Sequence, residues 1–171
     1  CIETAVGFKH FASFLTQCRE EEKIGLAVES SGGFTSSDHT LEKCGFLPAV
    51  LLAQIVAESN QSLSDLRKSL HTEYGAHVFL EEEFHCNSSQ KEKLSAVLTT
   101  LTDEEIASQY NHSITHIQRI DGVKLLFKDD SWVLIRLSGT EPLARIYAEA
   151  DTSSRAKNTI ESTKKMLFNI L

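Results

Sequence analysis

The sequence predicts an α/β partial domain, with a mostly parallel sheet and helices, followed by a two-layer α+β domain with a four-stranded antiparallel sheet and flanking helices. Two patterns support this prediction. In the first half, a short apolar run at residues 24–28 leads into a glycine-ended loop and then into helical periodicity, as in α/β units. In the second half, four alternating strand-like runs lie between two helical patterns. We place the first domain at residues 1–86 and the second at residues 87–171.

Helical periodicity occurs three times in the first domain, beginning with apolar residues at helix spacing up to Leu15. Pro48 lies in the first turn of the second helix, where its missing N–H costs nothing, and that helix is apolar almost all round, so we expect it to be sandwiched. Ser62 and Asp65 form a near capping box for the third helix, which Gly75 ends. The predicted elements are helices at 8–18, 47–57 and 62–74 and a buried, parallel strand at 24–28.

The second domain is expected to run from a helix through a sheet to a last helix. Ser89 and Glu92 form a capping pair for the first helix, and Thr102 with Glu105 predicts a further short helical turn. Adjacent aspartates at 129–130 indicate a tight hairpin between two strands. The predicted elements are an extended crossing at 77–85, strands at 113–119, 122–128, 131–137 and 143–150, and a helix at 152–170.

Composition limits the function classes. The 171 residues include 17 Lys plus Arg against 24 Asp plus Glu, a formal net charge of -7, so a nucleic-acid or anionic-membrane partner is not expected. The four cysteines show no C-x-x-C pairing and no disulfide-scaffold spacing, which predicts reduced thiols in a cytoplasmic protein. No apolar run reaches the ~18 residues of a membrane span. The chain begins at Cys1 without an export signal, so we expect a piece of a longer protein.

The segment R-L-S-G-T-E-P, which begins at Arg136, has the chemistry of an anion site between two predicted strands. Arg136 offers a guanidinium fork, and the hydroxyls of Ser138 and Thr140 supply two more donors. Gly139 is able to adopt a positive φ, which would let backbone N–H groups converge on an anion. We expect Glu141 to point away and bond the backbone of the loop. The alternative is a polar hairpin turn, for which Ser-Gly-Thr is ordinary chemistry.

A second polar segment, E-S-S-G-G from Glu29, follows the predicted strand of the first domain. Glu29 and Ser31 are two residues apart, so both side chains are able to face one side of an extended loop. A carboxylate that accepts two hydroxyl protons, beside a serine that donates or accepts, suits carbohydrate recognition. The alternative is a Ser/Gly turn that merely leaves a strand.

Both segments resemble loops of the phosphohexomutase family, the phosphoglucomutases and phosphomannomutases. The string R-x-S-G-T-E-P closely resembles the phosphate-binding loop in the fourth and last domain of that family. Glu29, Ser31 and Gly32 match the family's sugar-specificity loop in domain 3, G-E-x-S-G, although Val28 replaces the leading glycine. The two loops occur here in the order of the family.

Three shorter segments are similar to the same family. The Gly7-Phe8-Lys9 string looks like its G-F-K element, which borders the substrate, so Gly7 and Lys9 are candidate site residues. The S-D-H string ending at His39 and the following Glu-Lys pair ending at Lys43 resemble S-D-H and E-K-D-G, with Cys44 in place of the aspartate. His39 and Lys43 are therefore candidate active-site cations. Solvated loop residues are the alternative for both.

The resemblance implies the latter part of domain 3 and all of domain 4 of a four-domain mutase. In that family a phosphoserine in domain 1 donates its phosphate to a hexose monophosphate, the bisphosphosugar reorients, and the other phosphate returns to the serine. Mg²⁺ binds an aspartate-rich loop in domain 2. Neither the serine loop nor the aspartate-rich loop occurs in these 171 residues. We therefore expect no metal site and no catalytic residue in this chain, and no activity of the chain alone.

The resemblance also implies the partners, which are a phosphosugar substrate and the missing N-terminal domains. Its site residues are Arg136, Ser138, Gly139, Thr140 and Arg145 for the phosphate, and Glu29, Ser31 and Gly32 for the sugar. A different class stays open beside the mutase: a non-catalytic sugar-phosphate-binding or interaction module, which the departures at Val28 and Cys44 favour.

Overall fold

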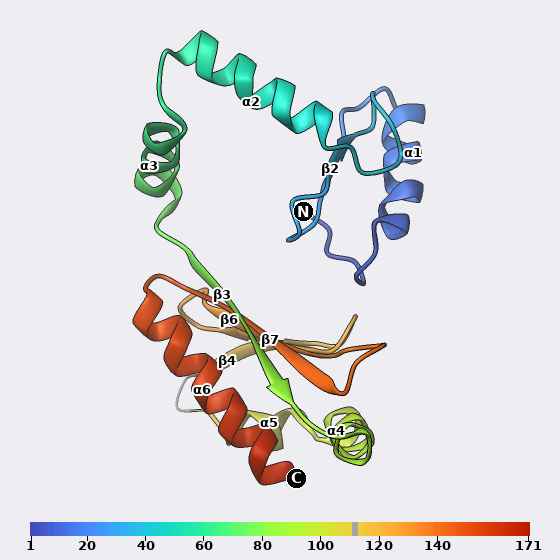
Figure 1. Ribbon diagram of the computed structural model, residues 1–171, viewed down its shortest axis with the longest axis vertical. Helices are drawn as coiled ribbons and strands as arrows, with labels where there is room; N and C mark the ends of the chain where they lie inside the picture. Colours follow the sequence, from blue (N-terminus) through green and yellow to red (C-terminus); the bar gives the residue numbers. More distant parts are fainter. Residues whose placement is uncertain (111–112) are drawn as a thin grey trace. The chain divides into compact units, whose positions relative to one another are not determined.

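The computed structural model describes residues 1–110 and 113–171. The chain forms two compact units, residues 1–70 and residues 71–171, which we describe separately (Figure 1). The α/β class of the first unit and the α+β class of the second agree with the sequence prediction.

The first unit combines four helical segments with one pair of strands. Its small core contains the buried side chains of Phe8, Leu15 and Ala27, with Phe11 and Leu41 packed against them. The elements are η1 (Phe8–Phe11), α1 (Ala12–Glu20), β1 (Leu26–Val28), β2 (Phe34–Ser36), α2 (Phe46–Ser59) and α3 (Leu63–Tyr74), the last of which runs into the second unit.

The strand pairing of the first unit differs from the prediction of a mostly parallel sheet. β1 pairs antiparallel with β2, with Val28 opposite Phe34. Only residues 29–33 separate the two strands, whereas a parallel connection needs about a dozen residues or more. The expected burial is also wrong, because Leu26 and Val28 are 67% and 66% exposed and only Ala27 between them is buried.

Helix α2 was expected to be sandwiched because its sequence is apolar almost all round. The structure describes this helix in full, and none of its residues is buried. Phe46 at its start is 84% exposed. The helix ends at Asn60, whose left-handed backbone (φ 52°) caps it. Sequence pattern and helical propensity therefore predict the helix, whereas its burial depends on packing partners that the pattern does not specify.

The second unit contains a five-stranded antiparallel sheet in the order β3-β7-β6-β5-β4. The sequence predicted four strands, because it placed residues 77–85 in a crossing before the boundary at 86. Those residues alternate between half-buried and exposed side chains, and β3 pairs along its whole length with β7. The elements are β3 (Val78–His85), α4 (Ser88–Thr100), α5 (Asp103–Ala107), β4 (Ile114–Gln118), β5 (Val123–Phe127), β6 (Trp132–Leu137), β7 (Leu143–Ala150) and α6 (Ser153–Ile170).

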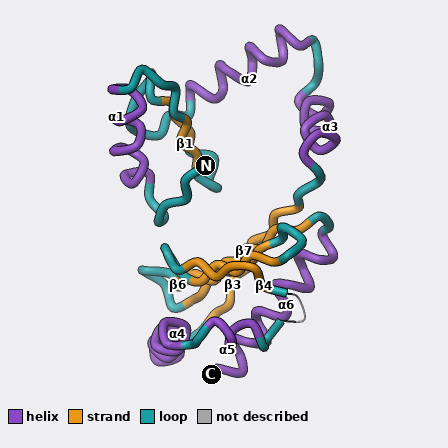
Figure 2. The backbone as a smooth tube through the Cα atoms, turned by 180° about the vertical axis from the view of Figure 1, so that it is seen from behind, coloured by secondary structure: helices purple, strands orange, loops and turns teal. Residues whose placement is uncertain are grey.

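Helices α4, α5 and α6 lie on one side of this sheet, as Figure 2 shows. Between the two layers, Leu125, Ile135 and Ile146 from the strands are at most 1% exposed. Each such side chain stabilises the fold by about 1.5–3 kcal/mol through burial. Because side chains alternate along a strand, Arg136 lies on the opposite face of β6, which these three helices leave uncovered, and its cross-strand partner on β7 is Arg145.

Capping residues set the start of the helices in the second unit. Thr102 and Glu105 form the predicted capping box of α5. For α4 the box is formed by Asn87 and Gln90, two residues before the predicted pair, because Asn87 has the extended backbone that a cap requires.

Tyr110 gives the second unit a testable pH dependence. Its ring is 8% exposed, and its hydroxyl lies 2.8 Å from the hydroxyl of Thr163 on α6. Burial raises the pKa of Tyr110 to about 12, from an ordinary value of 10.0. The unfolded chain therefore loses this proton first, so the free energy of unfolding should fall by about 2–3 kcal/mol between pH 10 and 12.

Tyr110→Phe tests this pH dependence, since phenylalanine keeps the ring and removes the ionisable group. We expect urea unfolding, followed by circular dichroism, to show lower stability at pH 8 from the lost hydrogen bond, but a shallower decline above pH 10. Equal slopes above pH 10 in both proteins would exclude Tyr110 as the source.

Candidate functional site

The loop between β6 and β7 contains most of the candidate phosphate-binding residues. Its ends are joined by a hydrogen bond of 3.0 Å from the amide of Ser138 to the carbonyl of Leu143. A second, of 2.9 Å, runs from the amide of Leu143 to the carbonyl of Glu141. The loop is therefore a closed hairpin turn on two well-paired strands, and its position relative to the sheet is fixed.

The side chain of Ser138 is hydrogen-bonded within the loop, which the sequence did not indicate. Its side chain is buried, and its hydroxyl oxygen accepts hydrogen bonds from the amides of Thr140 at 3.4 Å and Glu141 at 3.1 Å. These two amides serve the loop itself and are not converged on an outside anion. Ser138 thus shapes the turn, as serine commonly does in such loops. Its own O–H stays available as a donor.

Gly139 does not adopt the positive φ that would let the amides of the loop converge on an anion. Among the described glycines a positive φ occurs only at Gly7, Gly32, Gly75 and Gly122. A Cβ built on Gly139 would meet no atom within 4 Å. Neither the backbone nor a neighbouring residue in the described chain therefore requires glycine here, and the space above Gly139 is open. Thr140 is exposed beside it.

Arg136 and Arg145 stand opposite each other on the uncovered face of the sheet. The Nε atom of Arg136 lies 3.2 Å from Oδ2 of Asp121. A terminal nitrogen of Arg145 donates to Oε2 of Glu141 at 3.2 Å, and its Nε lies 3.8 Å from Oε1 of Glu83. Like charges in a cross-strand pair repel. The three carboxylates offset that repulsion, one at Arg136 and two at Arg145.

Glu141 departs from the expectation that it would bond the backbone of the loop. Its carboxylate is paired with Arg145, and its backbone carbonyl accepts a hydrogen bond of 3.1 Å from Lys91. Arg145 is thereby engaged within the protein. By contrast, no hydrogen bond involves the terminal nitrogens of Arg136 within residues 1–110 and 113–171. Arg136 is therefore the arginine whose fork is available to a ligand.

Both arginines carry an unsatisfied donor. The Nε atoms of Arg136 and Arg145 are buried and have no hydrogen-bond acceptor among the described residues. Asp121 is close to Arg136 Nε, but the N–H direction does not meet its oxygen, so the pair is an ion pair without an aligned hydrogen bond. A buried unsatisfied donor costs about 1–3 kcal/mol. Each of these donors faces a carboxylate, Asp121 or Glu83, without an aligned hydrogen bond.

The loop at residues 29–33 forms the second candidate site, within the first unit. The amide of Glu29 donates to the carbonyl of Gly33, and the amide of Gly32 donates to the carbonyl of Glu29, both at 2.9 Å. Gly32 has φ +83°, which a side chain would strain. The Ser31 hydroxyl donates to Glu29 Oε2 at 3.2 Å, and Lys43 Nζ lies 3.5 Å from the same oxygen. Glu29, Ser31 and Lys43 are thus brought together.

Gly7 and Lys9 are not joined to that loop. Gly7 precedes η1 with φ 125°, a backbone that favours glycine. Lys9 is exposed, and in the described part of the chain no hydrogen bond or ion pair links it to residues 29–33. The backbone conformation before η1 therefore accounts for a glycine at position 7, and the side chain of Lys9 is exposed to solvent in the free chain.

Cys44 and His39 form a small polar cluster at the start of α2. A hydrogen bond from the amide of Leu47, and another with His39, lower the pKa of the Cys44 thiol. Burial instead raises the pKa of Cys86. We expect iodoacetamide at neutral pH to alkylate Cys44 faster than Cys86, because the thiolate is the reacting form. Peptide mass spectrometry measures both sites in one sample, and equal rates would contradict this difference.

Family models match both units of the chain. The alpha/beta/alpha domain III of phosphoglucomutase/phosphomannomutase matches residues 1–74, and the C-terminal domain of the same family matches residues 86–165. The chain belongs to the phosphoglucomutase/phosphomannomutase family. The predicted resemblance is therefore confirmed.

Individual relatives agree with this assignment. A probable phosphoglucosamine mutase of Methanothermobacter thermautotrophicus is 29% identical over 99% of this chain and 35% of its own length. A phosphoglucomutase/phosphomannomutase of Thermococcus kodakarensis is 30% identical over 85% of this chain and 29% of its own length. The chain thus spans about a third of these relatives. The crystal structure of the phosphoglucomutase parafusin from Paramecium has the same fold, with a TM-score of 0.70 at 20% identity over 98% of this chain and 33% of that one.

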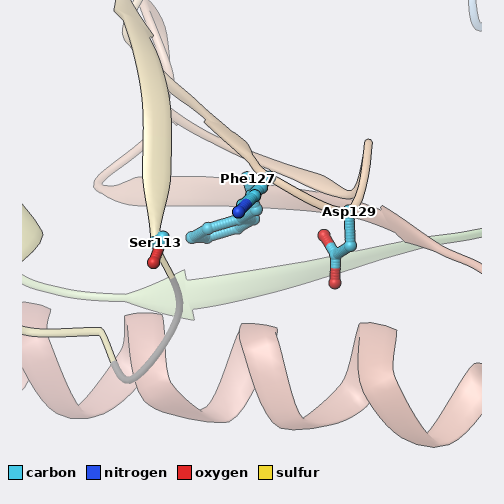
Figure 3. Close-up of a pocket in the computed structure, with 4 residues that line it drawn as sticks. Ser113, Phe127 and Asp129 are labelled. Atoms are coloured by element: carbon cyan, nitrogen blue, oxygen red, sulfur yellow. The ribbon is translucent and has the colours of Figure 1, made fainter.

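Other features of this mutase-family chain do not add to the candidate site. A shallow pocket of about 190 Å³ is lined by Ser113, Phe127, Lys128 and Asp129 (Figure 3). It lies near the β5–β6 turn, at the opposite end of β6 from the loop. Across the described residues no group of three His, Cys, Asp or Glu side chains is placed to hold a metal ion. None of the described helices is long and apolar enough to cross a membrane.

Sequence patterns did not indicate the acidic residues around the arginine pair of this family member. Asp121 comes from the β4–β5 turn and Glu83 from β3, whose pairing with β7 was not foreseen. The Asp-Gly string at 121–122 was a signal for a tight turn. Its contact with Arg136 follows only from the strand order, which a single sequence does not contain.

Proposed function

We propose that this chain is the substrate-binding C-terminal portion of a phosphohexomutase, an intramolecular phosphotransferase that interconverts hexose 1-phosphate and hexose 6-phosphate. The reaction passes through a phosphoserine enzyme and a bisphosphosugar intermediate. The observation that carries this proposal is the arginine pair on the uncovered face of the sheet, beside a loop whose sequence resembles the family's phosphate-binding loop. In this pair Arg136 makes no hydrogen bond through its terminal nitrogens to any described residue. Family membership supports the reaction class.

In this proposal the β6–β7 loop holds the phosphate that does not react. The terminal nitrogens of Arg136 bond two phosphate oxygens, and the hydroxyl of Thr140 and the O–H of Ser138 donate to the others. The missing side chain of Gly139 leaves room for the oxygens to approach. Arg145 exchanges part of its contact with Glu141 for the incoming dianion. Binding energy from this remote phosphate fixes the reacting hydroxyl or phosphate in line with the phosphoserine and so lowers the barrier.

The loop at residues 29–33 recognises the sugar. The carboxylate of Glu29 accepts hydrogen bonds from two neighbouring sugar hydroxyls. In the free chain that carboxylate is held by Ser31 and Lys43, both at Oε2. Sugar hydroxyls replace these contacts with equivalent ones, and Lys43 is then free to bond a phosphate or a ring oxygen. His39 contacts Cys44, the residue after Lys43, and adds a polar group to this part of the first unit.

Bond breaking depends on groups outside this chain. Mg²⁺ in this family supplies positive charge to the phosphoryl group in transfer, and the described residues here provide no ligand cluster for it. We place the metal, the phosphoserine and the remaining domains in the rest of the protein, since the chain spans about a third of its relatives. The four free cysteines are in keeping with a cytoplasmic enzyme.

Calorimetric titration of the 171-residue chain tests the binding role. Glucose 6-phosphate and glucose 1-phosphate should bind, whereas glucose without phosphate should bind at least about tenfold more weakly, since it lacks the charge-assisted contacts. Equal affinity for glucose and glucose 6-phosphate would overturn the proposal.

A mutase assay with Mg²⁺ and glucose 1,6-bisphosphate separates binding from catalysis. The chain alone should give no conversion of glucose 1-phosphate, because it lacks the serine loop and the aspartate-rich loop. Conversion by the chain alone would show that the reacting groups lie within these residues. A non-catalytic module would bind the same ligands, but its complete protein would lack both loops. Reading the coding sequence upstream of Cys1 distinguishes this module from the mutase.

A further inference from the structure

The β4–β5 turn lies directly against the backbone of β6 beside Arg136. Gly122 in this turn has φ +91°, and a Cβ built on it would lie 2.2 Å from the carbonyl oxygen of Ile135 and 3.2 Å from Cα of Arg136. Only a residue without a side chain allows this approach. The turn therefore brings the preceding residue, Asp121, to a fixed position at the phosphate-loop end of β6.

From that position Asp121 reaches one edge of the Arg136 guanidinium. Its Oδ2 lies 3.2 Å from Nε, and both side chains are partly buried, with 33% of Asp121 and 24% of Arg136 exposed. The contact is at the Nε edge and involves no terminal nitrogen. Arg145 instead has a carboxylate at both edges, with Glu83 3.8 Å from its Nε and Glu141 bonded to a terminal nitrogen. The two arginines are thus restrained differently, and only Arg136 keeps both terminal nitrogens for another group.

We infer that Asp121 is a positioning residue for phosphate binding, which holds the Nε edge of Arg136 so that its terminal nitrogens meet the phosphate oxygens. This inference rests on the proposed function of the loop. A guanidinium presents two terminal nitrogens as a fork and has a second hydrogen-bonding edge at Nε. A long arginine side chain also loses rotamer freedom when it binds a ligand, which costs free energy. A carboxylate at the Nε edge removes much of that freedom before the ligand arrives.

The charge of Asp121 alone predicts the opposite effect on phosphate affinity, so the direction of the change tests the inference. Asp121 is a negative charge beside a site for a dianion, so if it acted only through its charge, neutralising it would strengthen phosphate binding. A positioning role requires that Asp121→Asn weaken binding. The sign of the change in Kd for glucose 6-phosphate therefore distinguishes the two.

The experiment compares Asp121→Asn with Asp103→Asn in the 171-residue chain. Asp103 forms an ion pair of the same length, 3.2 Å, with Arg119 in the same unit, so it is a matched control for the loss of one Asp–Arg pair. Calorimetry should show about tenfold weaker binding of glucose 6-phosphate by Asp121→Asn and a change of less than about twofold by Asp103→Asn. The Arg136 Nε–H resonance should broaden or shift in free Asp121→Asn only.

Asp121→Glu keeps the charge and covers the case in which Asp121→Asn does not fold. It should recover binding to within about threefold of the unsubstituted chain, since the carboxylate is retained. Binding by Asp121→Asn that equals or exceeds that of the unsubstituted chain would overturn the inference and leave the proposed function standing. Failure of the unsubstituted chain itself to bind glucose 6-phosphate would instead refute the proposed function.

Discussion

Replacing Arg136 by alanine is expected to weaken the binding of glucose 6-phosphate by at least about 30-fold, equivalent to ~2 kcal/mol, the scale of a lost charge-assisted contact. Arg136 is the arginine of the pair whose terminal nitrogens have no hydrogen-bond partner in the described structure. Its removal also takes a positive charge away from the Asp121 carboxylate, which lies 3.2 Å from Arg136 and is repelled by the phosphate. Calorimetry at constant ionic strength measures the change.

Lys157→Ala is the matched control for that experiment. Lys157 is an exposed residue of α6, on the helix-covered side of the same sheet, and its substitution also removes one positive charge from the second unit. Its effect on affinity should stay below about twofold, because an exposed charge across the sheet from the loop is screened by salt. Arg136→Lys should fall between the two, since an ammonium group lacks the planar fork. Equal affinity of Arg136→Ala and Lys157→Ala would remove Arg136 from the site.

The second large effect is expected from Gly122→Ala, which should lower the free energy of unfolding of the second unit by at least about 3 kcal/mol. The added Cβ would lie 2.2 Å from the carbonyl oxygen of Ile135 in the backbone of β6, and φ is +91°. A backbone carbonyl within a sheet has little freedom to move. The turn must therefore shift away from β6, which also separates Asp121 from Arg136.

Gly139→Ala provides the comparison. A Cβ at Gly139 would meet no atom within 4 Å and the residue has no positive φ, so stability should change by less than about 1 kcal/mol. Phosphate affinity should nevertheless fall, because the methyl group would occupy space that the proposal gives to phosphate oxygens. Urea unfolding of both variants, followed by circular dichroism, measures the contrast. Similar stabilities of Gly122→Ala and Gly139→Ala would mean that the β4–β5 turn does not pack closely against the backbone of β6.

Sequence patterns predicted the helices, the two candidate loops and the family, because each depends on short strings. Thr102 with Glu105 is an example, since a capping box is complete within four residues. The strand β3 was missed because acidic residues at 81–83 hide its alternation, which becomes clear only from its pairing with β7.

The electrostatics of the loop could not be predicted for the same reason. Glu141 was expected to bond the backbone, yet it pairs with Arg145, which the hairpin brings to within reach. Asp121 is distant from Arg136 in sequence and approaches it only through strand order. The residue types also did not indicate that the hydroxyl oxygen of Ser138 accepts hydrogen bonds from two amides of its own loop. Contacts across strands depend on register, which the residue types alone do not specify.

The most direct test of the phosphate site is a titration of the ¹⁵N-labelled chain with glucose 6-phosphate, followed by NMR at the arginine side chains and backbone amides. Phosphate binding at the β6–β7 loop should give saturable shifts of the Arg136 and Arg145 Nε–H resonances and of the Gly139 and Thr140 amides, with little change at Arg155 on α6. Shifts confined to other regions, or arginine Nε–H resonances that stay unchanged at saturation, would contradict the assignment of the β6–β7 loop as the phosphate-binding site.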